Sequence, residues 1–287
     1  MIQPFEVPML RLTLLIALLA GDVSWTQANE DGEKCAAEAE RNDFNLSIDF
    51  CTAAIQSGQL SDQDLAITFN NRAFAYYNKK DYQQAIRDYD RAISLQPNYG
   101  LALTRRGAAL LEKHQYEHAL ADYDAATQLD AKLVSGRSKG FLFFFLGRMT
   151  QSAETFENCL KSDPDDIGVI LFRYLVEAKI GNALAAAREL EADSAKLKER
   201  HWPTPIIDFH LGKIDEKAMF AAANDPDPKK RSEQICAANF HAGEARLFRA
   251  NVTTAIALLR AAEKDCPSHL YESHGASTEL KRLGQKR

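Results

Sequence analysis

The sequence predicts an all-α fold in which antiparallel helix pairs stack along the chain. The main observation is internal repetition, because Asp88-Tyr89-Asp90 returns 34 residues later as Asp122-Tyr123-Asp124. Small residues recur at the same offset, so that Ala73 corresponds to Gly107 and Ala85 to Ala119. Small residues at fixed positions allow two helices to cross closely, and an interval of this length suits one helix pair per repeat.

A third copy follows at an offset of 33 residues. Gly140 takes the place of Gly107, and Phe156 takes the place of Tyr123 beside the small residues. Pro97 and Pro164 then close the first and third copies, because proline lacks an amide proton and clashes with the preceding helical turn.

These positions resemble the tetratricopeptide repeat (TPR) pattern over most of the chain. The segment from Asn71 to Tyr76, followed by Asp81-Tyr82 and Ala85-Ile86, matches the pattern well. The resemblance implies a TPR solenoid, a right-handed superhelix whose concave face is formed mainly by the first helix of each pair, with additional C-terminal helices. We divide the chain into a signal peptide (1–28), an N-terminal helix pair (29–65), three repeats (66–166), a degenerate repeat with connecting helices (167–232), and a terminal repeat with a C-terminal tail (233–287).

The N-terminus has the features of an export signal. Arg11 precedes the apolar stretch from Leu12 to Ala20, which is shorter than the roughly 20 residues that a membrane-spanning helix needs. Thr26-Gln27-Ala28 offers small residues for cleavage after Ala28. Leu19-Ala20-Gly21 is similar to the start of a bacterial lipobox, but Asp22 stands where the lipidated cysteine would be. We therefore expect a soluble periplasmic protein without a membrane anchor once the signal is removed.

The charge pattern argues against nucleic acid as a partner. The net charge is −5, both signs are interspersed, and no basic stripe occurs.

The five cysteines include two pairs that an antiparallel hairpin would bring together. Cys35 and Cys51 lie about equally far from a turn near Asp43, and Cys236 and Cys266 lie at the same end of the terminal helix pair. We therefore predict disulfides Cys35–Cys51 and Cys236–Cys266, which an exported protein can form; the alternative is free, buried thiols. Cys159 is expected to be a buried free thiol at a helix crossing.

Two short motifs are typical of enzymes, but both have a structural explanation. Ser138 lies in a G-x-S-x-G sequence, yet no strand pattern precedes it and Gly140 is needed at a helix crossing. His114 and His118 form an H-x-x-E-H sequence, but the repeat register places His114 in a turn. We expect no catalytic residue, metal ion or cofactor.

The repeat register also predicts which side chains line a partner-binding groove. They lie on the first helix of successive pairs and are Asn70, Phe74, Tyr77, Thr104, Arg105, Arg137, Phe141, Phe144, Leu171 and Leu175. The amide and guanidinium groups among them suit a carboxylate. The helix containing Phe143-Phe144-Phe145 is apolar on every face and should be covered on every face. A partner peptide, the C-terminal helices of the same chain or a second subunit could provide that cover.

The segment from His201 to Ile214 resembles the corresponding stretch of the bacterial lipoprotein NlpI family. That resemblance covers roughly residues 60–283 and implies a homodimeric adaptor of the cell envelope, which presents substrates to a protease or cell-wall hydrolase. The expected function is thus a non-enzymatic, protein-binding periplasmic scaffold. The alternative is a structural accessory subunit of an export or polysaccharide-assembly complex.

Overall fold

The computed structural model describes residues 26–198, 201–267 and 269–285, and these residues form helices and turns without a strand. The all-α prediction is therefore confirmed. Most of the predicted signal peptide lies outside the described residues. Its last positions, Thr26 to Ala28, belong to a helix that covers residues 26–40, and Ala28 is only 1% exposed.

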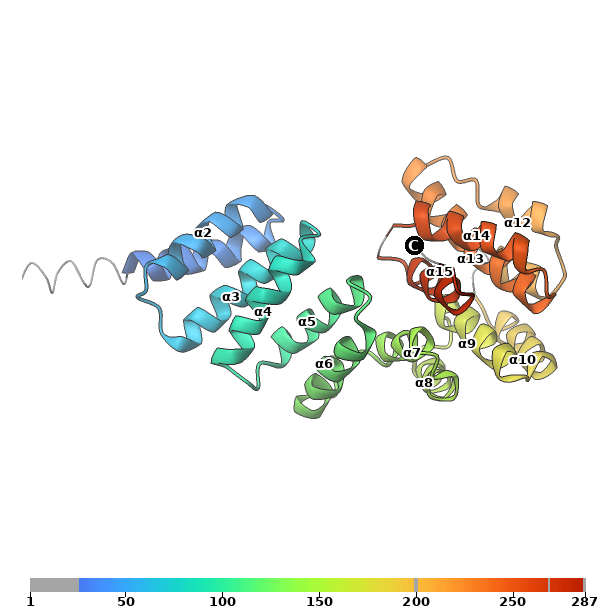
Figure 1. Cartoon of the computed structure of the whole chain (residues 1–287), viewed down its shortest axis with the longest axis horizontal. Coiled ribbons are helices and arrows are strands. Elements are labelled where there is room, and N and C mark those ends of the chain that lie inside the picture. The colour runs from blue at the N-terminus through green and yellow to red at the C-terminus, as the bar shows by residue number, and fades with distance from the viewer. Residues whose placement is uncertain (1–25, 199–200, 268, 286–287) are drawn as a thin grey trace, which may run out of the picture. The chain divides into compact units, whose positions relative to one another are not determined.

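The described chain runs as successive helical hairpins (Figure 1). Residues 26–40 pair with α2 (Phe44–Gln56), α3 (Asp62–Asn78) with α4 (Tyr82–Leu95), α5 (Gly100–Glu112) with α6 (Tyr116–Leu129), α7 (Gly136–Phe145) with α8 (Met149–Ser162), and α9 (Ile167–Ile180) with α10 (Ala183–Ser194). The short helices α11 (Thr204–His210) and α12 (Glu216–Ala222) follow, and then α13 (Pro228–Phe248), α14 (Val252–Asp265) and α15 (Tyr271–Arg282).

The turns within several pairs have the same construction. Asn42, Lys80, His114 and Ala250 have positive φ angles of 62°, 62°, 57° and 57°. At three of these turns the next amide donates to a carbonyl five residues back, as from Asp81 to Tyr76 and from Asn251 to Arg246. A left-handed residue with this bond ends the first helix and reverses the chain in the fewest residues.

Close helix crossings account for the repeated small residues. A Cβ atom on Gly140 would lie 2.5 Å from the Phe156 ring, and one on Gly243 would lie 2.9 Å from Leu259. Tyr89 fills the corresponding space in the first copy and is fully buried together with Ala73 and Ala85. The assignment of small and aromatic positions from the sequence is thus consistent with the packing.

Paired arginine and aspartate side chains join the two helices of the repeats. Arg72 on α3 donates from Nε and Nη2 to the carboxylate of Asp88 at 2.7 and 2.9 Å, and Arg106 on α5 makes the same bidentate contact with Asp122 at 2.8 and 2.6 Å. Both aspartates are buried. Bidentate geometry fixes orientation as well as charge, so each pair sets how its hairpin closes.

The helices group into two compact units. Unit 1 comprises Met1–Lys113 and Ala121–Leu133, and unit 2 comprises His114–Leu120 and Val134–Arg287. The division between the two units falls within α6.

The last helix, α15, is deeply packed. It begins at Tyr271 and buries His274, Gly275, Ala276 and Leu280. A Cβ atom on Gly275 would lie 2.8 Å from the Phe240 ring of α13, so α15 packs closely against α13 within unit 2. Over the described residues, none of the helices has both the length and the apolar content that crossing a membrane requires.

Candidate partner-binding surfaces

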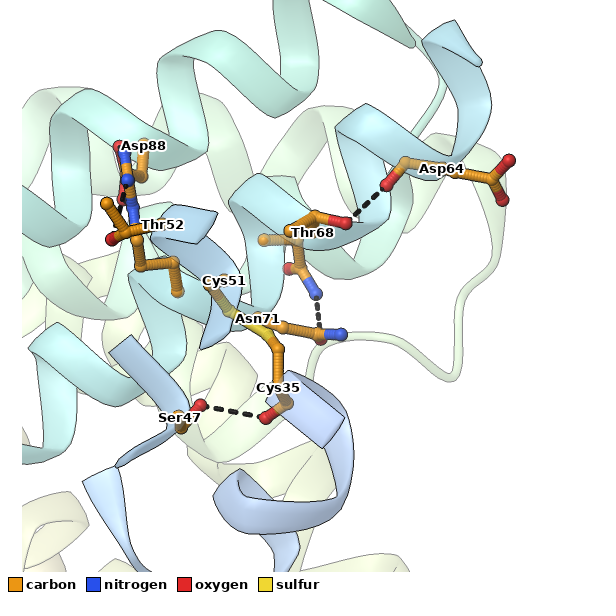
Figure 2. Close-up of a disulfide and its surroundings, with 10 residues drawn as sticks. Cys35, Ser47, Cys51, Thr52, Asp64, Thr68, Asn71 and Asp88 are labelled. Carbon is orange, nitrogen blue, oxygen red and sulfur yellow. Dashed lines mark hydrogen bonds and ion pairs between the residues drawn. A yellow bond between two sulfur atoms is a disulfide. The ribbon is translucent and has the colours of Figure 1, made fainter. Parts of the chain in front are cut away.

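Both predicted disulfides are present, one in each unit. Cys35 and Cys51 join the helix of residues 26–40 to α2 with their Cα atoms 5.0 Å apart, and Cys236 and Cys266 join α13 to the end of α14 at 5.1 Å. Figure 2 shows the first bond, beside which the Ser47 hydroxyl donates to the Cys35 carbonyl at 2.8 Å. These separations lie within the range that a disulfide spans, so each bond clips an end of the described helix array.

Cys159 is free, as expected, but half-buried rather than buried. Its sulfur lies 3.0 Å from the position of a Cβ atom on Gly136. Burial and the neighbouring Asp166 raise the pKa of the thiol. The thiolate, which is the reactive form, is therefore disfavoured.

In unit 1 the first helices of the pairs leave side chains open to solvent. Phe74 on α3 and Arg105 on α5 are half-buried, and the guanidinium carbon lies 4.6 Å from the ring centroid. Ile67 and Leu101 occupy the same position in successive repeats, and their side chains are 39% and 40% exposed. A groove of about 350 Å³, lined in part by Ile67 and Asn71, lies between the helix of residues 26–40 and α3. We call these exposed side chains of α3 and α5 the unit 1 face.

The other predicted groove residues of unit 1 are more enclosed. Asn70 is only 1% exposed, and its Oδ1 atom has no hydrogen-bond partner although its Nδ2 atom donates to Asn71 at 3.2 Å. Tyr77 packs against Tyr82 at 5.5 Å between ring centroids. The Thr104 hydroxyl donates to the Gly100 carbonyl at 3.0 Å. Of these three, only Tyr77 and Thr104 retain partial exposure.

In unit 2 the predicted groove residues Phe141 and Phe144 on α7 lie beneath α15, and those on α9 are buried in the core. Tyr271 stacks on Phe141 with ring centroids 3.6 Å apart and an interplanar angle of 10°. Arg282 donates to the Phe144 carbonyl at 2.8 Å. Phe141, Phe144, Leu171 and Leu175 are all 2% exposed or less. The sequence allowed a partner peptide, the C-terminal helices or a second subunit to cover the apolar helix α7. In the structure a C-terminal helix of the same chain covers it.

Arg137 stays at the edge of this covered face. Its side chain is 44% exposed and pairs with Asp166 at 3.0 Å. The guanidinium also lies over the rings of Phe141 and Tyr271, at 5.6 and 5.7 Å from their centroids. The guanidinium of Arg137 is thus already engaged by Asp166 and by the stacked rings of Phe141 and Tyr271.

A buried cluster of charges holds α15 in place. Lys179 on α9 contacts Glu244 on α13 at 2.7 Å and Glu279 on α15 at 3.3 Å. Burial, aided by the second carboxylate, raises the pKa of Glu244 to about 7. The two carboxylates overcome the opposing effect of burial and raise the pKa of Lys179. The ammonium therefore stays charged and ties three helices together.

Two neighbouring histidines in the same unit stay neutral. His210 Nε2 and His241 Nδ1 are 3.1 Å apart, among the rings of Phe172, Tyr174, Phe209 and Phe240. Burial, with a further contribution from Arg249, lowers the pKa of His210 to about 3, and burial also lowers the pKa of His241. The sequence reading missed this pair, because its members are separated by 31 residues and no motif joins them.

Residues of the two enzyme-like motifs lie in a helix start and in a turn between helices. Ser138 lies in the first turn of α7, where its amide donates to the Ser135 side chain at 3.2 Å. His114 occupies a turn with φ of 57°, and its Nδ1 atom lies 2.6 Å from the Tyr116 hydroxyl. Within the described ranges, no group of three or more potential ligands is arranged to hold a metal ion.

Comparison with known proteins agrees with this geometry. Models of the tetratricopeptide repeat match residues 66–99 and 138–166. The chain contains tetratricopeptide repeats. The TPR protein from Parabacteroides merdae ATCC 43184 is similar in structure, with a TM-score of 0.61 and 16% identity over 88% of this chain and 99% of that one.

A second similar structure is MamA, residues 41 to the end, from Desulfovibrio magneticus RS-1. It has a TM-score of 0.50 and 20% identity over 59% of this chain and 94% of that one. At these identities the likeness shows the fold, so the prediction of a TPR solenoid is confirmed. TPR proteins bind protein partners, and the TPR fold is generally a non-enzymatic scaffold.

Proposed function

We propose that this TPR protein is an exported scaffold of the cell envelope that binds a partner segment on the unit 1 face. The observation that supports this most directly is the Phe74–Arg105 pair, which offers an aromatic ring and a guanidinium side by side and partly open. A carboxylate beside an apolar side chain suits such a pair, because guanidinium groups form charge-assisted hydrogen bonds with carboxylates. The repeated exposure of Ile67 and Leu101 extends the apolar part of the face.

The proposed location is the periplasm. The signal-like N-terminus supports export, and two disulfides suit an oxidising compartment. In this role the protein would present partners to an envelope protease or cell-wall hydrolase, as the NlpI resemblance implies, and would do so without catalysis of its own.

Partner capture with a charge-reversal variant tests the proposal. Arg105→Glu should lose the partners that the unaltered protein retains from a periplasmic extract, identified by mass spectrometry. Arg91→Glu is the matched control, because Arg91 is an exposed arginine on α4, the second helix of the pair. If Arg105→Glu keeps every partner that Arg91→Glu keeps, the unit 1 face is not the binding site.

A structural accessory subunit of an export or polysaccharide-assembly complex is the second candidate. The covered face of unit 2 favours it, because a helix array that fills its own face with α15 has less surface for transient peptides. Stable co-purification in a defined complex that survives Arg105→Glu would support this role over the adaptor.

A further inference from the structure

Unit 2 contains a cleft of about 500 Å³ that none of the roles described above uses. We call it the Trp202 cleft. It is bordered by Trp202 just before α11, Asp225 in the loop before α13, Glu233 and Gln234 on α13, and Glu272 on α15. The Cys236–Cys266 disulfide fixes α13 to the segment that leads into α15, so the two acidic walls are held near each other.

Gln234 is one of the residues that line this cleft, and its side chain has an unsatisfied acceptor. Its side chain is 8% exposed, and its Nε2 atom donates to Asp225 Oδ2 at 3.3 Å. Exchanging the amide nitrogen and oxygen would turn the oxygen toward a carboxylate, so this hydrogen bond fixes the orientation. Gln234 Oε1 is left buried without a hydrogen-bond partner. A buried acceptor without a donor costs free energy that a ligand donor could recover.

Carboxylates outnumber cationic side chains among the described residues that line the cleft. Asp225 accepts from the Asp227 amide at 2.9 Å and from Gln234. Glu233 lies 3.7 Å from the exposed His269. Burial raises the pKa of Glu272, against the opposite effects of its backbone hydrogen bond and of Arg137, which is itself paired with Asp166. Lys230 is the one lysine or arginine among the described lining residues, and it is exposed.

Trp202 supplies an apolar wall. The residue is half-buried and packs on the cluster that includes Ile206 and Ile207. An indole ring is the best of the aromatic faces for a cation, and an arginine stacks on it while its donors stay free for acceptors.

We propose that the Trp202 cleft binds the guanidinium group of an arginine side chain in a partner protein. The inference rests on the proposed function as a protein-binding scaffold and assigns a second contact point, with charge preference opposite to that of Arg105. Arginine fits better than lysine because its planar fork carries five donors, whereas an ammonium is a compact, strongly hydrated point charge.

Tryptophan fluorescence provides a direct test. The chain has two tryptophans, and Trp25 lies within the expected signal peptide (1–28), so Trp202 is the sole reporter in the exported protein, and Trp25→Phe makes it so in the full-length chain. The probe is an acetylated, amidated pentapeptide with one arginine between glycine and serine residues, and the comparator replaces arginine by citrulline, which has the same shape without the charge. We expect saturable quenching by the arginine peptide and at least about tenfold weaker binding of the citrulline peptide. Equal binding of the two, or no binding of either, overturns the proposal.

Substitutions within the cleft should act in opposite directions. Glu272→Gln should weaken binding of the arginine peptide at least about fivefold, and Lys230→Gln should strengthen it, because it removes a like charge from the rim. Lys230 is exposed, so its variant keeps the test valid if Glu272→Gln fails to fold. Glu157→Gln on α8, whose carboxylate is 59% exposed, is the control and should change nothing.

Two further outcomes separate the interpretations. If Glu272→Gln and Lys230→Gln, both folded, bind like the control, the cleft is not the site. If agmatine, the free small-molecule guanidine, binds as tightly as the peptide, the cleft takes a small cation and the docking proposal is overturned. Arg105→Glu should leave these titrations unchanged, so a failure here is distinguishable from a failure of the unit 1 face.

Discussion

The first helices of the pairs differ in solvent exposure between the two units. On α3 and α5, Phe74 and Arg105 remain partly open, and Ile67 and Leu101 expose about 40% of their surface. On α7, Phe141 and Phe144 are almost completely buried, because α15 lies over them. One repeat pattern thus produces an open face in unit 1 and an internal core in unit 2.

The difference shows that repeat position alone does not decide whether a side chain is open to solvent. In unit 2 the exposure of these side chains depends on α15, which follows the repeats in the chain. Aromatic, basic and acidic side chains of α15 cover the face that would otherwise be open. Tyr271, Arg282 and Glu279 make these contacts from α15 to α7 and α9.

The largest expected effect comes from truncating a ring under α15. Phe144→Ala should cost unit 2 about 4 kcal/mol of unfolding free energy, because it leaves a cavity in a closed core. Phe74→Ala in unit 1 should cost only about 1 kcal/mol, because the ring is half-exposed, while it reduces partner capture. Urea unfolding followed by circular dichroism measures both. Equal costs for the two variants would show that the faces do not differ in burial.

Removing each disulfide should affect its own unit. Replacing Cys35 and Cys51 by serine should destabilise unit 1 by about 3 kcal/mol, and replacing Cys236 and Cys266 should destabilise unit 2 by a similar amount, because an open loop raises the entropy of the unfolded chain. Limited proteolysis with mass spectrometry locates the weakened unit. Cys159→Ser serves as the control, and a change in the opposite unit would contradict the assignment.

Acid should weaken unit 2 through its buried histidines. The folded pKa of His210 is about 3, below the ordinary value of 6.5, so the unfolded chain binds more protons between these values. The stabilising contribution is complete above pH 6.5 and is lost as pH falls toward 3. As pH falls from 6 to 4, the free energy of unfolding of the unaltered protein should decrease, relative to that of His210→Gln, by up to about 1.4 kcal/mol per pH unit.

The measurement is the difference in urea midpoint between the unaltered protein and His210→Gln across that pH range. Taking the difference cancels the opposite contribution of Glu244, which both proteins contain. The pKa of Glu244 is raised to about 7, so its own effect stabilises the folded state at lower pH. All seven histidines of the sequence fall within unit 2, and unit 1 should show no such histidine dependence. A parallel pH profile for wild type and His210→Gln would rule out this role for the pair.

The smallest effect is expected from the outer aspartate of the arginine network in unit 1. Asp90 contacts Arg106 at 2.7 Å, but its side chain is 51% exposed. Asp90→Asn should therefore cost about 0.5 kcal/mol, whereas Asp122→Asn, which disturbs a buried bidentate pair, should cost about 2 kcal/mol. Thermal unfolding at low and high salt distinguishes them, since salt should reduce only the Asp90 effect. A salt-sensitive loss in Asp122→Asn would contradict that distinction.

The sequence was sufficient to predict the repeat fold and the disulfides, because both depend on local periodicity. Gly140 against Phe156, and Cys236 against Cys266, follow from helix register within a hairpin. The cover over Phe141 could not be predicted in the same way, because Tyr271 belongs to a different part of the chain and has no repeat position. Asn70 was expected to face a groove, but register does not tell how closely neighbouring helices pack, and the side chain is buried.

The contact between Arg282 and the Phe144 carbonyl spans 138 residues of sequence. Because synthesis proceeds from the N-terminus, the hairpins of unit 1 can form before the last residues of unit 2 have been made. The side chains of α7, which contains Phe143-Phe144-Phe145, can in contrast be fully buried only after α15 has been made. Until then the apolar side chains that α15 covers remain exposed to solvent, so folding of this part of unit 2 depends on the C-terminal helix.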